Sequence, residues 1–331
     1  MSSNPAQQTA PKRGEARKVA GQVLQKLAAF LSLVLMVIFF SIGSPFFLSV
    51  NNLMTIILQS SVLGILAIGV TLVIVGGGID LSVGSVLAFS GMMIGVAVNA
   101  GVPLVLSILF GVFAGAFMGM VSGFLVSRAH MPPFIATLGM MMIARGLTLV
   151  VSDARPVYFL ETPAFPEISQ GMLFGVVPYP VLYVIGVAII SSFVLKKLAI
   201  GRYIYALGSN EEAASLSGIN VKNVKLFVYT YSGLLAGIAG LVLASRLSSA
   251  QPMAGLTNEL QAIAAAVIGG TSLSGGVGTI TGTLIGAVLM GVLRNGLNLM
   301  NVSQFWQEVA MGVVVIVAVY IDIMRQERGF D

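Results

Sequence analysis

The chain of 331 residues has no cysteine, a single histidine and few charges, because only 9% of its residues are Asp, Glu, Lys or Arg. Without cysteine it can form no disulfide, no thiolate metal site and no cysteine nucleophile. Hydrophobic residues make up 57% of the sequence, whereas soluble domains have about 45–50% apolar and about 25% charged residues. This composition excludes a soluble enzyme and a disordered chain. The basic residues are too few and too scattered for a nucleic-acid groove, despite a pI near 9.6.

Catalytic and nucleotide-binding motifs are also missing. The one histidine, His130, lies in the polar turn 127–133, so histidine-based triads and di-histidine metal sites have almost nothing to draw on. The patterns G-x-S-x-G and H-E-x-x-H are absent, and no lysine follows a glycine, which excludes a Walker A loop. An intramembrane hydrolase would have to use Ser272 or Ser274 with His130. We interpret His130 instead as a loop residue at the membrane interface, and we expect nucleotide hydrolysis on another chain.

Long uncharged stretches dominate what is present. Asp80 is the only charged residue between Leu27 and Ser127, a stretch that holds four membrane crossings at about 20 residues each. A membrane β-barrel would need strict alternation of polar and apolar residues. The sequence therefore predicts an all-α polytopic membrane protein with about ten transmembrane helices, some of them glycine-interrupted or re-entrant. We place the spans near residues 27–48, 53–75, 82–99, 103–126, 134–151, 178–196, 224–245, 258–268, 279–299 and 303–322.

The distribution of basic residues predicts the orientation of these spans. With ten spans, the basic residues of both tails and of the loop near residues 196–225 fall on one side, whereas Arg155 and Arg246 fall on the other. By the positive-inside rule, both termini are cytoplasmic. The first span is longer than a signal-peptide core, so we expect it to be uncleaved. The predicted organisation is a cytoplasmic tail (1–26), one transmembrane domain (27–322) with a periplasmic loop (152–177) and a cytoplasmic loop (197–223), and a cytoplasmic tail (323–331).

A short helix is predicted inside the cytoplasmic loop. Ser209 and Glu212 have the spacing of an S-x-x-E capping box, and Gly218 suits the left-handed residue that ends a helix. The pattern predicts a helix of two or three turns that lies on the membrane surface. It is either an amphipathic connector or a rigid element that docks a soluble partner.

Four segments resemble one family of transporters. Residues 212–218 match the E-A-A-x-x-x-G loop of ATP-binding-cassette importer permeases. Together with residues 78–85 (GIDLSVGS), 201–208 (GRYIYALG) and 269–276 (GGTSLSGG), this loop is similar to the permease subunits of ribose-type monosaccharide importers. The resemblance extends from about residue 30 to residue 322. It departs from the wider importer pattern at residues 219–222, which read I-N-V-K instead of I-x-L-P.

The resemblance implies partners and a location. A second copy of the chain, a soluble ATPase and a periplasmic or lipid-anchored sugar-binding protein would assemble with it in the lipid of the bacterial inner membrane. The chain itself would hold no cofactor, since ATP and Mg would bind the partner ATPase. Branched-chain amino-acid importers are related, but their zwitterionic substrates favour ionic groups along the path, and few are present here. The ATPase would dock at Ser209, Asn210, Glu211, Glu212, Ala213, Ala214 and Gly218.

Two glycine-rich breaks interrupt the apolar sequence. One follows the span 53–75, and the other follows the short run 258–268, which suggests a re-entrant helix. Paired breaks indicate a permeation site, although small residues also permit close helix packing. Asp80 either caps the next helix, accepting from Ser82 or Val83, or lines a gate. The candidates for the path or gate are Gly76, Gly77, Gly78, Asp80, Ser82, Gly269, Gly270, Thr271, Ser272 and Ser274.

Amide side chains gather near the outer half of the predicted spans. A neutral sugar requires amides and hydroxyls rather than a buried charge. The candidates for a sugar path are Gln59, Gln251, Gln261, Asn295 and Asn298, with Asn258, Gln304 and Gln307 as further amides. We place Trp306 in the interfacial aromatic belt, and Glu259, Arg294 and Glu308 at outer span ends. A function of another class, an ion-coupled secondary sugar transporter, would use Asp80 as its ion site.

Overall fold

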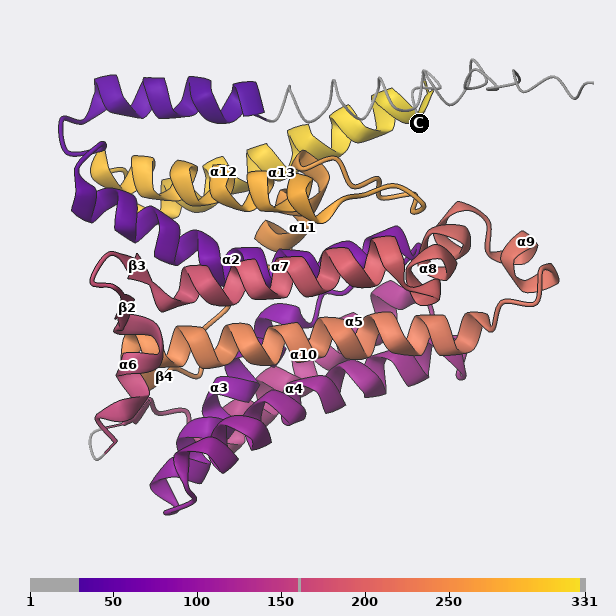
Figure 1. Ribbon diagram of the computed structural model, residues 1–331, viewed down its shortest axis with the longest axis horizontal. Coiled ribbons are helices and arrows are strands. Elements are labelled where there is room, and N and C mark those ends of the chain that lie inside the picture. Colours follow the sequence, from indigo (N-terminus) through magenta and orange to yellow (C-terminus); the bar gives the residue numbers. More distant parts are fainter. Residues whose placement is uncertain (1–29, 160–161, 328–331) are drawn as a thin grey trace, which may run out of the picture.

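The computed structural model describes residues 30–159 and 162–327, and nearly all of this part is helical (Figure 1). Three apolar helices are short, namely Phe30–Gly43, α3 (Val83–Asn99) and α11 (Asn258–Ile268). Seven described helices are long and apolar enough to cross a membrane: α2 (Val50–Val75), α4 (Leu104–Ser127), α5 (Pro133–Val151), α7 (Tyr179–Lys197), α10 (Val221–Leu247), α12 (Ile280–Leu299) and α13 (Gln304–Glu327).

Seven of the predicted spans coincide with the seven long helices, and the other three overlap the short ones. The prediction of an all-α polytopic membrane fold is confirmed, whereas the number of ten crossings stays a prediction. The last helix continues to Glu327, into the predicted tail 323–331, whereas residues 1–26 and 328–331 lie outside the described residues.

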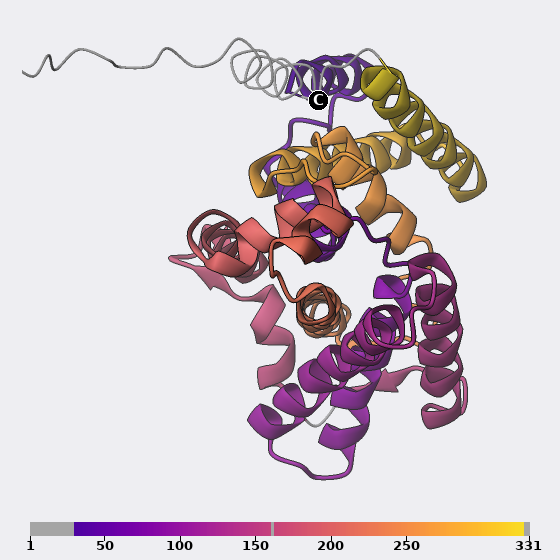
Figure 2. The same cartoon turned by 90° about the vertical axis from the view of Figure 1, so that its right-hand side faces the viewer.

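Helix α2 lies at the centre of the molecule. Every residue from Ser60 to Val75 is buried, which is typical of a helix that is apolar all round. Helices α7, α10, α11 and α12 pack against it, as the view along the helices shows (Figure 2). The helix ends at a glycine run whose second residue, Gly77, has a positive φ of 80°.

Helices α4 and α10 pack backbone against backbone. A Cβ atom on Gly233 of α10 would lie 2.8 Å from the Cα atom of Gly119 in α4, and one on Gly115 would lie 3.0 Å from the Cα atom of Gly237. Small residues thus allow an approach that larger side chains would prevent, which is how membrane helices associate without a hydrophobic driving force.

The predicted outer loop folds onto the C-terminal end of α10. It contains β1 (Val157–Tyr158), which pairs antiparallel with β4 (Ser249–Ala250), then α6 (Ala164–Gln170) and the short hairpin of β2 (Met172–Leu173) with β3 (Val177–Pro178). Ser245 Oγ donates to the Phe165 carbonyl at 2.7 Å, and Ser169 Oγ donates to the Val242 carbonyl at 2.9 Å. These strands therefore define one end of the molecule, which we call the strand end.

The cytoplasmic loop of the prediction defines the opposite end. It contains α8 (Ala199–Ser209) and α9 (Glu211–Leu216), which Figure 1 places far from the strands, and we call this the α9 end. Helix α10 begins beside α9 and ends at β4, so its 27 residues join the two ends over about 40 Å.

Candidate functional site

The short helix α9 differs from the predicted one in its cap and length. Its cap is Asn210, whose Oδ1 accepts from the Ala213 N–H at 2.8 Å, so the predicted capping box of Ser209 and Glu212 is wrong. Ser209 ends α8 instead, where its Oγ donates to the Tyr205 carbonyl at 2.9 Å. The helix has six residues, which is less than two turns at about 3.6 residues per turn and so shorter than predicted. Gly218 has the predicted left-handed conformation, with a φ of 82°.

Helix α9 is anchored on one side and exposed on the other. Ala214 is buried, and Lys225 Nζ of α10 lies 2.7 Å from a carboxylate oxygen of Glu211. Glu212 is exposed, and the Leu216 side chain is 84% exposed at the C-terminal end of the helix. The exposed side of α9 therefore presents an acidic side chain and a leucine at the α9 end of the molecule.

Helix α8 is not among the predicted elements, although its sequence has a helical signal. Gly201, Ile204 and Leu207 are buried and lie three residues apart, which is the spacing of one helix face. Tyr205 Oη donates to the Gly278 carbonyl at 2.8 Å, and burial raises the pKa of Tyr205, so its hydroxyl keeps its proton at neutral pH. This bond ties α8 to the second glycine-rich break.

The two glycine-rich breaks meet at the end of α8, in a contact that we call the glycine crossing (Gly77, Gly208, Gly275 and Gly276). Gly276 N–H donates to the Val75 carbonyl at 2.9 Å. A Cβ atom on Gly275 would lie 3.1 Å from the Cα atom of Gly77 and 3.0 Å from that of Gly208. A Cβ atom on Gly208 would overlap the Val75 carbonyl oxygen. Three separate chain segments therefore touch through their backbones.

Asp80 lies in the first break and is 1% exposed. Its Oδ1 accepts from the Ser82 N–H at 2.9 Å and from Ser82 Oγ at 2.6 Å, so the predicted bond from Ser82 is present. The cap residue of α3 is Ser82 itself, however, and not Asp80 as predicted. Asp80 Oδ2 accepts from Ser232 Oγ of α10 at 2.8 Å, a partner that the sequence did not reveal. In the second break, Thr271 and Ser272 are buried, whereas Ser274 is exposed. A gate role for either break stays a prediction.

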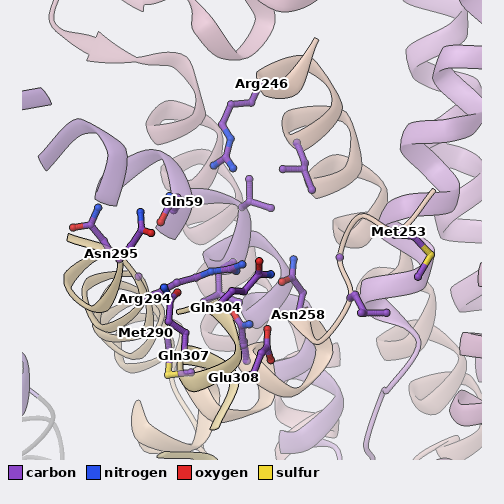
Figure 3. Close-up of a pocket in the computed structure, with 18 residues that line it drawn as sticks. Gln59, Arg246, Met253, Asn258, Met290, Arg294, Asn295, Gln304, Gln307 and Glu308 are labelled. Carbon is purple, nitrogen blue, oxygen red and sulfur yellow. The ribbon is translucent and has the colours of Figure 1, made fainter. Parts of the chain in front are cut away.

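A polar cavity of about 560 Å³ lies near the strand end (Figure 3). Its walls come from α2, α11, α12, the C-terminal end of α10 and the N-terminal end of α13. Seven amide side chains that the sequence analysis named line it, namely Gln59, Asn258, Gln261, Asn295, Asn298, Gln304 and Gln307. Its size falls within the range of about 300–1,000 Å³ that is common for ligand sites.

Some candidates for the sugar path lie elsewhere or have other partners. Gln251 is outside the cavity, and its Nε2 donates to Ser249 Oγ at 2.9 Å. Asn295 pairs with Asn52 of α2 through two amide hydrogen bonds of 2.8 and 3.0 Å, so part of its capacity to hydrogen-bond a sugar is already used. Trp306 is 67% exposed and does not line the cavity.

Three charged residues among those described also line this cavity, so the expectation that few ionic groups lie along the path does not hold here. Arg294 and Glu308, expected at span ends, face it, whereas Glu259 does not line it. Arg246, which falls just outside the predicted span 224–245, lies in the last turn of α10 and lines the cavity as well. The continuation of the apolar pattern of α10 through Leu247 was the signal that could have placed it.

Three helices connect the cavity with the glycine crossing. Helix α2 runs from Gln59 at the cavity to Val75 at the crossing, and α11 runs from Asn258 and Gln261 to the second break. Helix α12 begins just after Gly278 and returns to Arg294 at the cavity. A displacement of the crossing would thus move three walls of the cavity.

A helical membrane domain with a polar cavity at one end and a tethered helix at the other is suited to a transport permease. Residues 52–319 match the family described as the branched-chain amino acid transport system / permease component, and the chain belongs to this family.

Individual relatives are more specific. The chain is 47% identical over 301 residues to the ribose import permease protein of Bacillus subtilis, covering 91% of this chain and 93% of the relative. It is 44% identical over 305 residues to the ribose import permease protein of Haemophilus influenzae, covering 91% and 94%. It is 42% identical over 294 residues to the D-allose transport system permease protein of Escherichia coli, covering 88% and 90%.

Family membership decides between the classes of function that the sequence left open. The chain is a multi-pass inner-membrane permease subunit and not an enzyme, so ATP hydrolysis belongs to a separate ATPase. Neither an intramembrane hydrolase nor an ion-coupled transporter that uses Asp80 is supported by these relatives.

Proposed function

We propose that this chain forms the translocation path of an ATP-driven importer for a neutral monosaccharide such as ribose or allose. The names of its relatives support this substrate class. The observation that carries the proposal is the amide-lined cavity, because amides match the hydroxyl groups of a sugar as both donors and acceptors. The cavity is joined through α2, α11 and α12 to a crossing that α8 holds in place.

The proposed mechanism is alternating access. Two copies of the chain span the membrane with ten crossings each and both termini in the cytoplasm, surrounded by lipid. A partner ATPase, which holds ATP and Mg, docks on residues 209–218, and a periplasmic or lipid-anchored binding protein delivers the sugar at the strand end. Closure of the ATPases displaces α9 and α8, and the glycine crossing transmits this displacement to the cavity walls. In this mechanism the residues of the two glycine-rich breaks line the path or form its gate.

Reconstituted transport tests this function. Proteoliposomes that contain the permease and its ATPase, supplied with the binding protein, should accumulate radiolabelled ribose or allose only when ATP is provided. A proton or sodium gradient without ATP should give no uptake. Uptake driven by an ion gradient would contradict the proposal and restore the secondary-transporter alternative.

Docking on α9 gives a separate prediction. The variant Leu216→Asp places a charge at an exposed apolar position, which should reduce copurification of the ATPase by at least about tenfold, since desolvating an unpaired charge in an interface costs several kcal/mol. Phe174→Asp is the matched control, because Phe174 is 91% exposed but lies between β2 and β3 at the strand end. Equal ATPase recovery with both variants would show that α9 is not the docking element.

A further inference from the structure

Two arginines face the cavity from different helices. Arg246 comes from the last turn of α10 and Arg294 from α12, and Figure 3 shows both guanidinium groups pointing into the space between the amides. Among the described residues, no carboxylate lies within salt-bridge distance of either group. Glu308 is the acidic residue that lines the cavity, so the lining carries a formal excess of positive charge.

This charge has a direct consequence for what enters. A guanidinium group stays protonated at every physiological pH and donates hydrogen bonds in a fixed planar arrangement. Sugar hydroxyl oxygens accept such bonds, so a neutral sugar gains contacts with both arginines. A cation is repelled by the two guanidinium groups instead. The apolar helices around the cavity strengthen this repulsion because they lower the local dielectric constant.

We propose that Arg246 and Arg294 form a cation-excluding filter at the entrance of the sugar path. The inference rests on the proposed function, in which this cavity receives the sugar. The filter adds a step of selectivity after delivery by the binding protein: uncharged polyols pass, whereas ammonium compounds and metal cations are repelled. Arginines act in the same way in pores that reject cations.

The absence of cysteine makes a direct test possible. The substitution Asn298→Cys places a single thiol on the cavity wall, one helical turn from Arg294. Phe174→Cys places a control thiol at an exposed position of the same end. Each variant, in complex with its ATPase in lipid nanodiscs, is treated with two methanethiosulfonate reagents of similar size, one with a sulfonate and one with a trimethylammonium group. The measured quantity is the ratio of the two rate constants at each thiol.

We expect the ratio of sulfonate to trimethylammonium rates to be at least about tenfold higher at Asn298→Cys than at Phe174→Cys, as a local positive potential requires. Added Arg246→Gln and Arg294→Gln substitutions should bring the ratio down to that of the control thiol or below it, because Glu308 remains, whereas Arg246→Lys and Arg294→Lys should retain the high ratio. Glu308→Gln should raise the ratio of sulfonate to trimethylammonium rates at Asn298→Cys, and high salt should lower this ratio.

Two results would overturn the filter: equal ratios at the two thiols, or a ratio that the double glutamine variant leaves unchanged. If the double variant does not copurify with the ATPase, each single glutamine variant must lower the ratio by itself. The labelling needs no transport, so a failure of ATP-driven sugar uptake would contradict the proposed function without affecting this test.

Discussion

Sugar uptake should be lost when Gly208 is replaced by alanine. The new methyl group would overlap the Val75 carbonyl oxygen and would lie 2.5 Å from the Gly276 nitrogen, which are the two atoms of one backbone hydrogen bond. Backbone atoms of three segments cannot move aside as a flexible side chain can, so the crossing must open. Overpacking of this kind costs about 1–3 kcal/mol, and we expect the upper end of this range for Gly208→Ala.

The measurement is ATP-driven uptake together with the ATPase activity of the complex. We expect uptake to fall at least about tenfold, whereas the ATPase still binds α9, because the exposed residues of that helix are unchanged. Gly186→Ala in α7 is the control, since a Cβ atom there would meet nothing within 4 Å. Uptake by Gly208→Ala equal to that of the control would show that the crossing does not transmit motion.

Removal of the Asp80 carboxylate should have the second large effect. In Asp80→Ala the Ser82 N–H and the hydroxyl groups of Ser82 and Ser232 lose their acceptor inside the membrane domain. Each buried polar group left unsatisfied costs about 1–3 kcal/mol. We expect a destabilisation of about 3 kcal/mol or more, measured as a lower thermal midpoint in detergent, and loss of uptake.

Asp80→Asn separates a positioning role from an ionic one. The asparagine oxygen can accept both bonds from Ser82, and its amide group can donate to Ser232 Oγ, which also accepts. Uptake and thermal midpoint should therefore stay close to those of the unchanged chain. An asparagine variant as inactive as the alanine variant would instead indicate that the negative charge itself is required.

The helices could be predicted from the sequence because the membrane makes the signal strong. Polar residues are expensive in lipid, so the few that occur within apolar runs stand out. This is why the sequence indicates Gln59, Gln261 and Asn298, which the structure brings together around the cavity. The paired breaks were visible because glycine runs weaken helices.

Other features depend on distances that no local pattern encodes. Ser209 and Asn210 are both good helix caps, and only the extended backbone of Asn210, with a φ of −163°, decides between them. The role of Gly208 follows from its contact with Val75 and Gly276, which are distant in sequence. Ser232 likewise meets Asp80 across 152 positions of the chain. Single-sequence patterns report faces and ends of elements but not which of them touch.

The close packing of α4 on α10 has a mechanical consequence. A Cβ atom on Gly119 would lie 2.9 Å from the Gly233 Cα atom, so neither helix can slide along the other without driving backbone into backbone. We therefore expect the pair to move as one rigid unit during a transport cycle. Asp80, bonded to Ser232 of α10, joins the first glycine-rich break to this unit.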